Sequence, residues 1–138
     1  GLPIRPALRI VDDVLRSYGL RSDLRVIVAE KILTADDLLE MICYGADFVN
    51  IARGFMISAG CIRARECSGA GGRNCPVGLA TMDEGKRSKY LVEEKAQNIA
   101  NYHNALIDTL RSLLAVMGKQ DIDELSMEDL NLTNKTKV

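Results

Sequence analysis

From residue 25 to residue 51 the sequence reads RVIVAEKILTADDLLEMICYGADFVNI. Residues 25–29 form an apolar run with β-branched side chains, which is too short for a helix and typical of a buried parallel strand. The TADD motif at residues 34–37 is a helix N-cap signal, and the apolar positions after it keep helical spacing until Gly45. Residues 47–51 form a second short apolar run. The stretch therefore predicts a strand, a helix and a second strand, the order found in parallel βα units.

The sequence on either side of this stretch predicts further helices. Residues 1–6 contain two prolines and are expected to form a loop, after which apolar residues at helical spacing predict a helix that stops near Gly19. Asp12 and Asp13 are expected at exposed positions of that helix. A short helix is expected from Phe55 to Gly60, directly before a glycine-rich loop that runs to about residue 83.

One long helix is predicted in the second half of the chain, from Leu91 to Met117, with Gly118 ending it. The acidic segment 121–130 is expected to hold a last short helix, and residues 131–138 are expected to be frayed. The apolar stripe of the long helix contains one histidine, which at such a position usually serves a core or an interface. The members of this stripe are Ile99, His103, Leu106, Leu110, Leu113 and Met117.

Two predicted strands are too few for a complete parallel sheet. Parallel sheets are normally buried on both faces, and a pair of strands cannot cover itself in this way. The chain is therefore expected to be part of a larger α/β fold. It also starts without Met, so we expect either an excised fragment or a chain whose missing strands come from another chain.

The composition is that of a soluble, intracellular globular protein. The chain has 138 residues, the usual size of one domain, with 47% hydrophobic and 27% charged residues. A formal net charge of -1, with four Tyr, two Phe and no Trp, argues against general binding of nucleic acids or membrane surfaces. The apolar runs are shorter than a bilayer span and no secretory leader is visible, so a cytoplasmic location is expected.

Three cysteines lie close together in the segment CIRARECSGAGGRNC, at Cys61, Cys67 and Cys75. Thiolates are soft metal ligands, and a glycine-rich chain can turn three of them toward a common point. Pro76 follows the last cysteine, as often happens in iron–sulfur ligand runs, whereas the spacing differs from that of a zinc ribbon. Nearby positive charge would lower the thiol pKa values and offset the charge of a cluster, and it comes from Arg63, Arg65 and Arg73.

Several motifs together resemble a known family. They are GLPIRPAL at residues 1–8, ARGFM at 52–56, GCIRAREC at 60–67 and CPVGLAT at 75–81. In this order they resemble the flavin-binding synthase domain of glutamate synthase, and in particular the stand-alone FMN-binding glutamate-synthase-like proteins. The resemblance covers residues 1 to about 118, which leaves residues 119–138 as an acidic and polar C-terminal tail.

The resemblance implies a (β/α)8 TIM barrel that holds FMN and a three-iron (3Fe-4S) cluster. This chain would be its C-terminal part, the last two strand–helix units, with a cysteine-rich loop and a long C-terminal helix. Residues 25–29 would be strand seven and residues 47–51 strand eight. The loops after these strands commonly form a phosphate site in such barrels.

The FMN phosphate would accordingly lie near two short segments of this chain. Glu30 and Lys31 follow the first strand, and Ala52, Arg53 and Gly54 follow the second. Lys31 and Arg53 supply positive charge, and a helix N-terminus just past Gly54 supplies N–H groups. The family usually has glycine where Glu30 stands, so a carboxylate here replaces a close approach of the backbone. The alternative is that these segments are ordinary strand ends and turns.

The resemblance also implies that Cys61, Cys67 and Cys75 are the ligands of the 3Fe-4S cluster. The gap between the second and third cysteine, Ser68 to Asn74, is longer than the family's usual gap. Structural or vestigial thiols and a zinc site are the alternatives. Cys43, on the predicted helix 35–44, is expected to be a buried small hydrophobic residue.

The function implied is that of the C-terminal portion of a flavin-dependent oxidoreductase. It would form glutamate reductively, with electrons passing through the iron–sulfur cluster to FMN, and this chain alone would be inactive. Its main partner would be the remainder of the barrel, from upstream polypeptide or from another chain. The alternative is a non-catalytic interaction module that pairs its open sheet with another chain, including a second copy of itself, and keeps vestigial cysteines.

Overall fold

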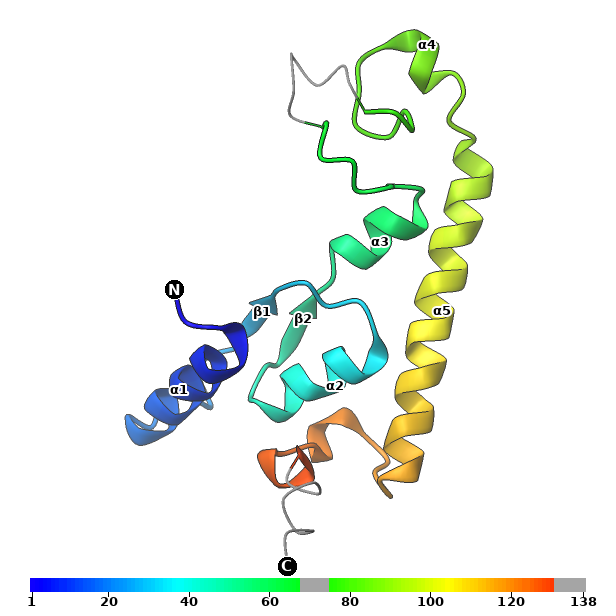
Figure 1. The fold of residues 1–138 in the computed structure, drawn as a ribbon. Coiled ribbons are helices and arrows are strands. Elements are labelled where there is room, and N and C mark those ends of the chain that lie inside the picture. Colours follow the sequence, from blue (N-terminus) through cyan, green and yellow to red (C-terminus); the bar gives the residue numbers. More distant parts are fainter. Residues whose placement is uncertain (68–74, 131–138) are drawn as a thin grey trace, which may run out of the picture. The chain divides into compact units, whose positions relative to one another are not determined.

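The computed structural model describes residues 1–67 and 75–130 (Figure 1). The elements in chain order are α1 (Ile4–Ser17), β1 (Ile27–Ala29), α2 (Ala35–Cys43), β2 (Phe48–Asn50), α3 (Arg53–Ser58), α4 (Glu84–Arg87), α5 (Val92–Val116) and the 3-10 helix η1 (Ile122–Glu124). They form two compact units. The sheet unit comprises Gly1–Ile51 and the chain from Leu106 onward, and the cysteine unit comprises Ala52–Ala105.

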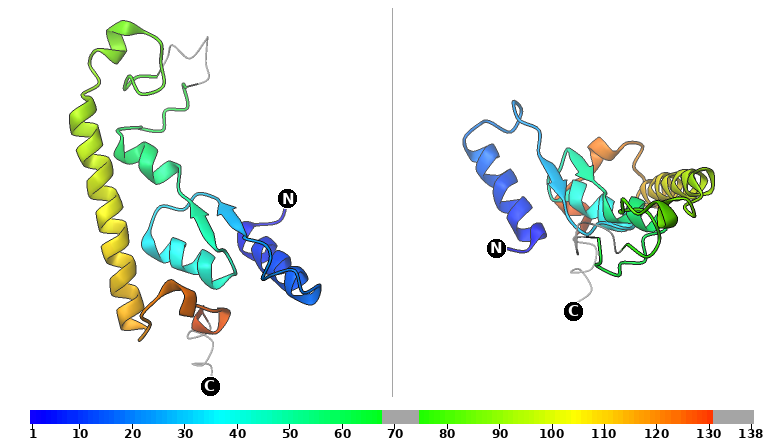
Figure 2. Two further views of the ribbon diagram at one scale, coloured as in Figure 1. Left: turned by 180° about the vertical axis from the view of Figure 1, so that it is seen from behind. Right: turned by 90° about the horizontal axis from the view of Figure 1, so that it is seen from above.

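The sheet unit is built on two parallel strands, as the sequence predicts. β1 and β2 pair in the register Ile27 with Phe48, Val28 with Val49, and Ala29 with Asn50. Both strands are shorter than the predicted runs because only three residues of each take part in the ladder. The arrangement is a helix-dominated α/β fold with a small parallel sheet, viewed from two further directions in Figure 2.

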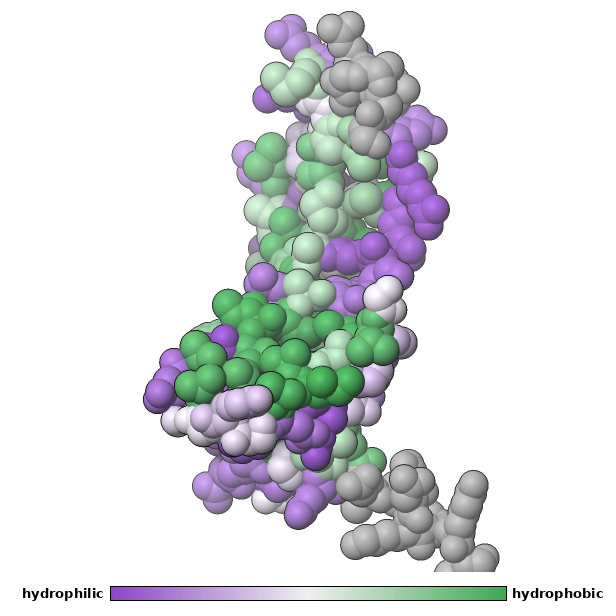
Figure 3. Space-filling model, turned by 90° about the vertical axis from the view of Figure 1, so that its left-hand side faces the viewer, coloured by the Kyte–Doolittle hydropathy of each residue, from purple (hydrophilic) through white to green (hydrophobic). Residues whose placement is uncertain are grey.

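Among residues 1–67 and 75–130, side chains cover only one face of this sheet. Val28 is 3% exposed and belongs to a cluster of buried side chains from α1, α2 and the loops beside them: Leu8, Val28, Ile32, Met41 and Ala46. On the opposite face the paired residues Ile27 and Phe48 are 62% and 58% exposed. A space-filling view toward the side of α1 and β1 shows apolar side chains gathered there (Figure 3).

Helix α1 begins earlier than the sequence predicts. The expected loop over residues 1–6 is wrong beyond Pro3, which is the N-cap residue of a helix that starts at Ile4. Pro6 lies in the first turn, where its missing N–H would have no intrahelical partner and its fixed φ suits the helix. The predicted stop near Gly19 is confirmed, since α1 ends at Ser17 and Gly19 has a φ of 69°.

Helix α2 has the predicted cap. The Thr34 side chain accepts a hydrogen bond from the backbone N–H of Asp37, which satisfies one of the free donors of the first turn. The helix ends at Cys43, and Gly45 follows with a φ of 106°. A Cβ atom at Gly45 would overlap the side chain of Asp12, so glycine is required there both by backbone conformation and by space.

Helix α5 supplies part of the second apolar cluster of the sheet unit. Its residues Leu106, Leu110 and Leu114 are buried together with α2 side chains. The predicted stripe is confirmed at Leu106 and Leu110. His103, expected to serve a core or an interface, is exposed and outside the buried cluster, but its ring lies beside that of Phe55 with 6.3 Å between ring centroids. The histidine precedes the turns of α5 that enter the apolar cluster.

Two short elements complete the described chain. Helix α4 was not predicted, because four residues between loops give no periodic signal. The last short helix expected in segment 121–130 is present as η1, and residues 127–130 form a second 3-10 turn. Within residues 1–67 and 75–130, no helix is both long and apolar enough to cross a membrane.

Candidate functional site

The first predicted phosphate segment leaves the carboxyl end of β1. Glu30 and Lys31 directly follow Ala29, which pairs with Asn50, the last residue of β2. Both side chains are exposed. Within the described ranges neither side chain forms an ion pair, so the Lys31 ammonium and the Glu30 carboxylate are exposed neighbouring charges of opposite sign.

The second predicted phosphate segment opens helix α3, in the cysteine unit. Ala52 is the N-cap residue and has no side-chain hydrogen bond to the helix, so the first N–H groups of α3 lack a capping side chain. Arg53 is half-buried and forms no ion pair with any described residue. This segment therefore presents positive charge and backbone donors, the groups that an anion requires.

Gly54 has a packing role in addition to the predicted one. It is buried, and a Cβ atom at this position would overlap the hydroxyl group of Tyr102 on α5. The neighbouring residue Phe55 packs edge-on against the Tyr102 ring, with centroids 5.2 Å apart. A glycine thus allows α3 to approach α5 closely, whether or not a phosphate lies nearby.

Cys61 is fixed by the end of helix α3. Gly60 adopts a φ of 99°, and its N–H donates to the carbonyl oxygen of Ile57 at 2.8 Å. The Cys61 N–H then donates to the carbonyl oxygen of Met56 at 2.9 Å. These two bonds are a Schellman motif, which satisfies the last carbonyls of the helix and sets the direction in which the cysteine leaves it.

Cys75 lies in a turn that surrounds its sulfur with donors. The side chain is 7% exposed, and its Sγ accepts a hydrogen bond from the Ala80 N–H at 3.5 Å. This bond lowers the pKa of the Cys75 thiol most; burial opposes it, and the amides of residues 77–79 add to the lowering. A thiolate is therefore favoured here by the backbone of the CPVGLA segment, which is the form that binds metals.

Cys67 and the arginines before it lie on a more open stretch of chain. Cys67 is exposed, as are Arg63 and Arg65, whose φ values are 60° and 62°. Left-handed backbone at residues with a Cβ is uncommon and costs energy, so the turns between Cys61 and Cys67 are conformationally unusual. Arg73 and the rest of the segment 68–74 lie outside the described residues.

All four cysteines are free thiols, and the structure treats them differently. Cys43 is buried in the sheet unit, where burial raises the pKa of its thiol to about 11, in agreement with its expected role as a small hydrophobic residue. In the described ranges no three His, Cys, Asp or Glu side chains are gathered closely enough to hold a metal ion. The donor set Cys61, Cys67 and Cys75 nevertheless fits a cluster chemically, with three thiols and a sulfur already hydrogen-bonded by amides.

The sequence did not reveal a buried ion network in the sheet unit. Asp12 was expected to be exposed but is 5% exposed, and its carboxylate accepts bonds from Arg16 at 2.6 Å and from Arg21 at 2.7 Å. Arg21 also pairs with Asp47 at 2.9 Å and donates to the carbonyl oxygen of Gly45. The network ties α1 to the turn before β2, so the positions of Asp12 and Asp47 could be understood only from tertiary structure.

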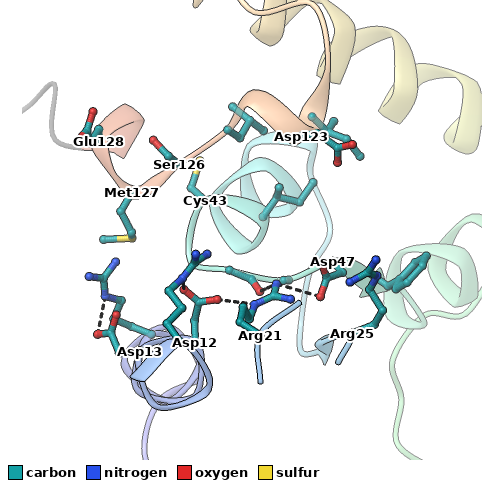
Figure 4. A pocket seen from close by; sticks show the side chains of 18 residues that line it. Asp12, Asp13, Arg21, Arg25, Cys43, Asp47, Asp123, Ser126, Met127 and Glu128 are labelled. Carbon is teal, nitrogen blue, oxygen red and sulfur yellow. Dashed lines mark hydrogen bonds and ion pairs between the residues drawn. The ribbon is translucent and has the colours of Figure 1, made fainter. Parts of the chain in front are cut away.

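This network lines an open cavity of about 1060 Å³ at the amino ends of the strands (Figure 4). Burial alone would raise the pKa of Asp12, but hydrogen bonds from Arg16 and Arg21 outweigh it, so the pKa is lowered. Burial would likewise raise the pKa of Asp47, but hydrogen bonds from the Val26 N–H and from Arg21 lower it. Figure 4 shows Arg21 between Asp12 and Asp47, where its charge is compensated by both carboxylates and it joins α1 to the turn before β2.

Comparison with known proteins relates these features to one family. A family model described as the conserved region in glutamate synthase matches residues 1–120. The glutamate synthase large subunit-like protein YerD of Bacillus subtilis is 47% identical over 118 residues, which are 86% of this chain and 22% of that protein. The archaeal-type glutamate synthase (NADPH) of Thermotoga maritima is 32% identical over 125 residues, 91% of this chain and 24% of that protein.

A longer relative shows the same pattern. The glutamate synthase (NADH) of Saccharomyces cerevisiae is 30% identical over 125 residues, 91% of this chain but 6% of that protein. The chain thus spans about a quarter or less of the length of these curated relatives. The match over residues 1–120 shows that the chain belongs to the glutamate synthase family, whose conserved region it contains.

Proposed function

We propose that this chain is the C-terminal portion of a glutamate-synthase-like oxidoreductase, the last two strand–helix units of a (β/α)8 barrel. The reaction would be reductive glutamate formation, and the chain alone would not catalyse it. The observation that carries the proposal is the uncovered sheet face. Ile27 and Phe48 are paired across the strands and more than half exposed, whereas parallel sheets in complete domains are covered on both sides.

The outer surface of α1 supports the same proposal. Ile10, Val11 and Val14 are 50%, 45% and 48% exposed, so this helix also leaves apolar area in water. Contiguous apolar surface of this kind usually marks a contact with another part of a protein. The remaining six strand–helix units of a barrel, from upstream polypeptide or another chain, would cover both surfaces.

The residues after β1 and β2 fit an FMN phosphate by their charge. Lys31 and Arg53 bring two positive charges without ion-pair partners among the described residues, against the single carboxylate of Glu30. Lys31 and Arg53 would hold the phosphate together with the first N–H groups of α3, and Glu30 would weaken that hold by repulsion. Bound FMN would supply the hydride and electron transfer of the reaction.

The three cysteines of the cysteine unit fit the iron–sulfur cluster. Cys61, Cys67 and Cys75 would be its ligands, and the cluster would supply one-electron transfer to the flavin. The chain's own contribution is to lower the pKa of the Cys75 thiol, mainly through the hydrogen bond from the Ala80 N–H and further through the amides of residues 77–79. Arg63 and Arg65 would offset part of the negative charge of three thiolates.

The test is anaerobic purification of the full-length protein, followed by measurement of FMN, iron and acid-labile sulfide per chain. We expect a brown protein that contains all three, and loss of iron and sulfide with retained folding when Cys61 and Cys75 are changed to Ser. Cys43→Ser is the matched control, because that thiol is buried in the sheet unit and is expected to leave the iron content unchanged.

A colourless protein without FMN, iron or sulfide would overturn the enzymatic proposal.

The alternative function, a non-catalytic module that pairs its open sheet with another chain, is favoured by the same exposed Ile27 and Phe48. It predicts a self-associated or partner-bound protein whose assembly survives dilution in light-scattering measurements. It also predicts that Phe48→Lys abolishes assembly without any change in metal or flavin content.

A further inference from the structure

The described cysteine unit contains two separately anchored arms, each of which ends in a cysteine. The first arm, residues 59–61, continues from α3 and holds Cys61 through the Schellman motif. The second arm, residues 75–80, is the turn that places amides around the Cys75 sulfur. For two thiols to serve one centre, something must keep the two arms in a fixed relation.

The second arm is packed against the end of α4. Gly78 in this arm has a φ of 77°, and a Cβ atom there would lie 2.5 Å from the carbonyl oxygen of Lys86. The same hypothetical Cβ would be 3.5 Å from the Cβ of Tyr90. The Tyr90 N–H donates to the carbonyl oxygen of Arg87 at 3.0 Å, so the backbone of Tyr90 is held at the end of α4.

The side chain of Tyr90 reaches the first arm. Its hydroxyl group donates to the carbonyl oxygen of Ala59 at 2.6 Å, across 31 residues of sequence. Ala59 is the C-cap residue of α3, it is 6% exposed, and it stands two positions before Cys61. Tyr90 therefore lies beside Gly78 of the Cys75 arm through its Cβ and bonds the Cys61 arm through its hydroxyl group.

We propose that Tyr90 is a positioning residue that sets the relation between Cys61 and Cys75 by its hydroxyl bond to Ala59. The inference rests on the proposed function, because it takes the two cysteines as ligands of one centre. In the described ranges no hydrogen bond joins Tyr90 to either sulfur, so its effect on the cysteines would pass through Ala59, which it bonds, and through Gly78, beside which its Cβ lies. Loss of the hydroxyl group frees the arms from one another while the Schellman motif and the Cys75 turn each remain intact.

The experiment measures how readily Cys61 and Cys75 bind one molecule of a two-thiol reagent in the metal-free full-length protein. Phenylarsine oxide is the probe, since its arsenic forms bonds to two thiol sulfurs with release of one water and so captures only thiols that can meet. The protein carries Cys67→Ser to remove the exposed third thiol, and Cys43 is buried with a raised thiol pKa. Mass spectrometry after digestion identifies the bridged cysteines.

We expect Tyr90→Phe to weaken phenylarsine oxide capture by Cys61 and Cys75 about fivefold, the effect of one net hydrogen bond. Phe keeps the ring and its packing, so folding is expected to persist. Ser88→Ala is the matched control: it removes a hydroxyl-to-carbonyl bond, to Gly85, that stays within the α4 region. It is expected to leave capture unchanged, even if it lowers the thermal midpoint as much as Tyr90→Phe does.

Gly78→Ala tests the tether from the other arm, because its Cβ would push the Cys75 turn away from Lys86 and Tyr90. It is expected to reduce capture as well. Equal capture by the Cys67→Ser parent with and without Tyr90→Phe, or no bridged pair in that parent, overturns the inference. Wild-type protein that bridges the two thiols but takes up no iron or sulfide overturns the cluster and leaves the positioning role of Tyr90 standing.

Discussion

The sheet unit and the cysteine unit are stabilised in different ways. In the sheet unit, large apolar side chains such as Met41, Leu39 and Leu110 are buried. The ion pairs of Asp12, Arg21 and Asp47 also join α1 to the turn before β2. In the described part of the cysteine unit the buried hydrophobic residues are only Ala59 and Cys75. That unit is held by backbone turns, caps and the Tyr90 bond, so it gains little from burial of apolar area.

This difference in buried apolar area indicates that the two units have different roles. A region with few buried apolar contacts opens at low free-energy cost. A group that binds only the closed form stabilises that form, by an amount that rises with the logarithm of its affinity. The sheet unit is therefore a scaffold that folds through its own core. The cysteine unit is a loop system whose order depends on its anchors and, in our proposal, on the metal centre that its thiols bind.

The largest expected effect is a cavity in the core of the sheet unit. Met41 is 1% exposed, and Met41→Ala is expected to lower the free energy of unfolding by about 3 kcal/mol. Met82→Ala removes the same atoms from a side chain in the cysteine unit that is 74% exposed. This change should alter the free energy of unfolding by less than about 0.5 kcal/mol. Urea unfolding followed by circular dichroism measures both; similar losses would contradict the comparison.

The next effect concerns the ion network. Asp12→Asn removes the carboxylate that Arg16 and Arg21 share. It is expected to lower the free energy of unfolding by about 2 kcal/mol, which is less than the loss of a fully buried pair because Arg16 is exposed. Asp13→Asn is the control, since Asp13 is half exposed and its only ion-pair partner among the described residues is Arg9, on the same helix. The same urea titration gives both values, and a cost for Asp13→Asn as large as that for Asp12→Asn would refute the special role of Asp12.

The network also predicts how stability depends on pH. The pKa values of Asp12 and Asp47 are lowered in the folded state from the ordinary value of 3.8, so both carboxylates bind protons more readily when the chain unfolds. Their contribution is present above about pH 4 and is lost as the pH falls through the folded-state pKa values. Urea midpoints should therefore drop below pH 4, and less steeply in Asp12→Asn. An identical slope in the variant would show that other carboxylates dominate.

The contrast between the units also explains what the sequence could predict. The strands and α2 followed from β-branched runs, the Thr34 cap and Gly45, which are local signals. Asp12 could not be placed, because the partner that buries it, Arg21, lies beyond the end of α1 and meets it only when the loop folds back. The cysteines were visible as a pattern, whereas the donors around Cys75 and the tether from Tyr90 depend on turns whose geometry no periodicity encodes.

The smallest expected effect compares two helix caps of the same kind. Thr34 accepts from the Asp37 N–H at the start of α2, and Asp83 accepts from the Lys86 N–H at the start of α4. Thr34→Ala is expected to lower the free energy of global unfolding by about 1 kcal/mol, because α2 belongs to the cooperative core. Asp83→Ala should leave the free energy of global unfolding unchanged. It should instead speed amide hydrogen exchange severalfold in α4 and in the turn around Gly78 that packs on α4. Exchange that accelerates across both units in the Asp83 variant would mean that they unfold together, and the distinction between scaffold and loop system would then fail.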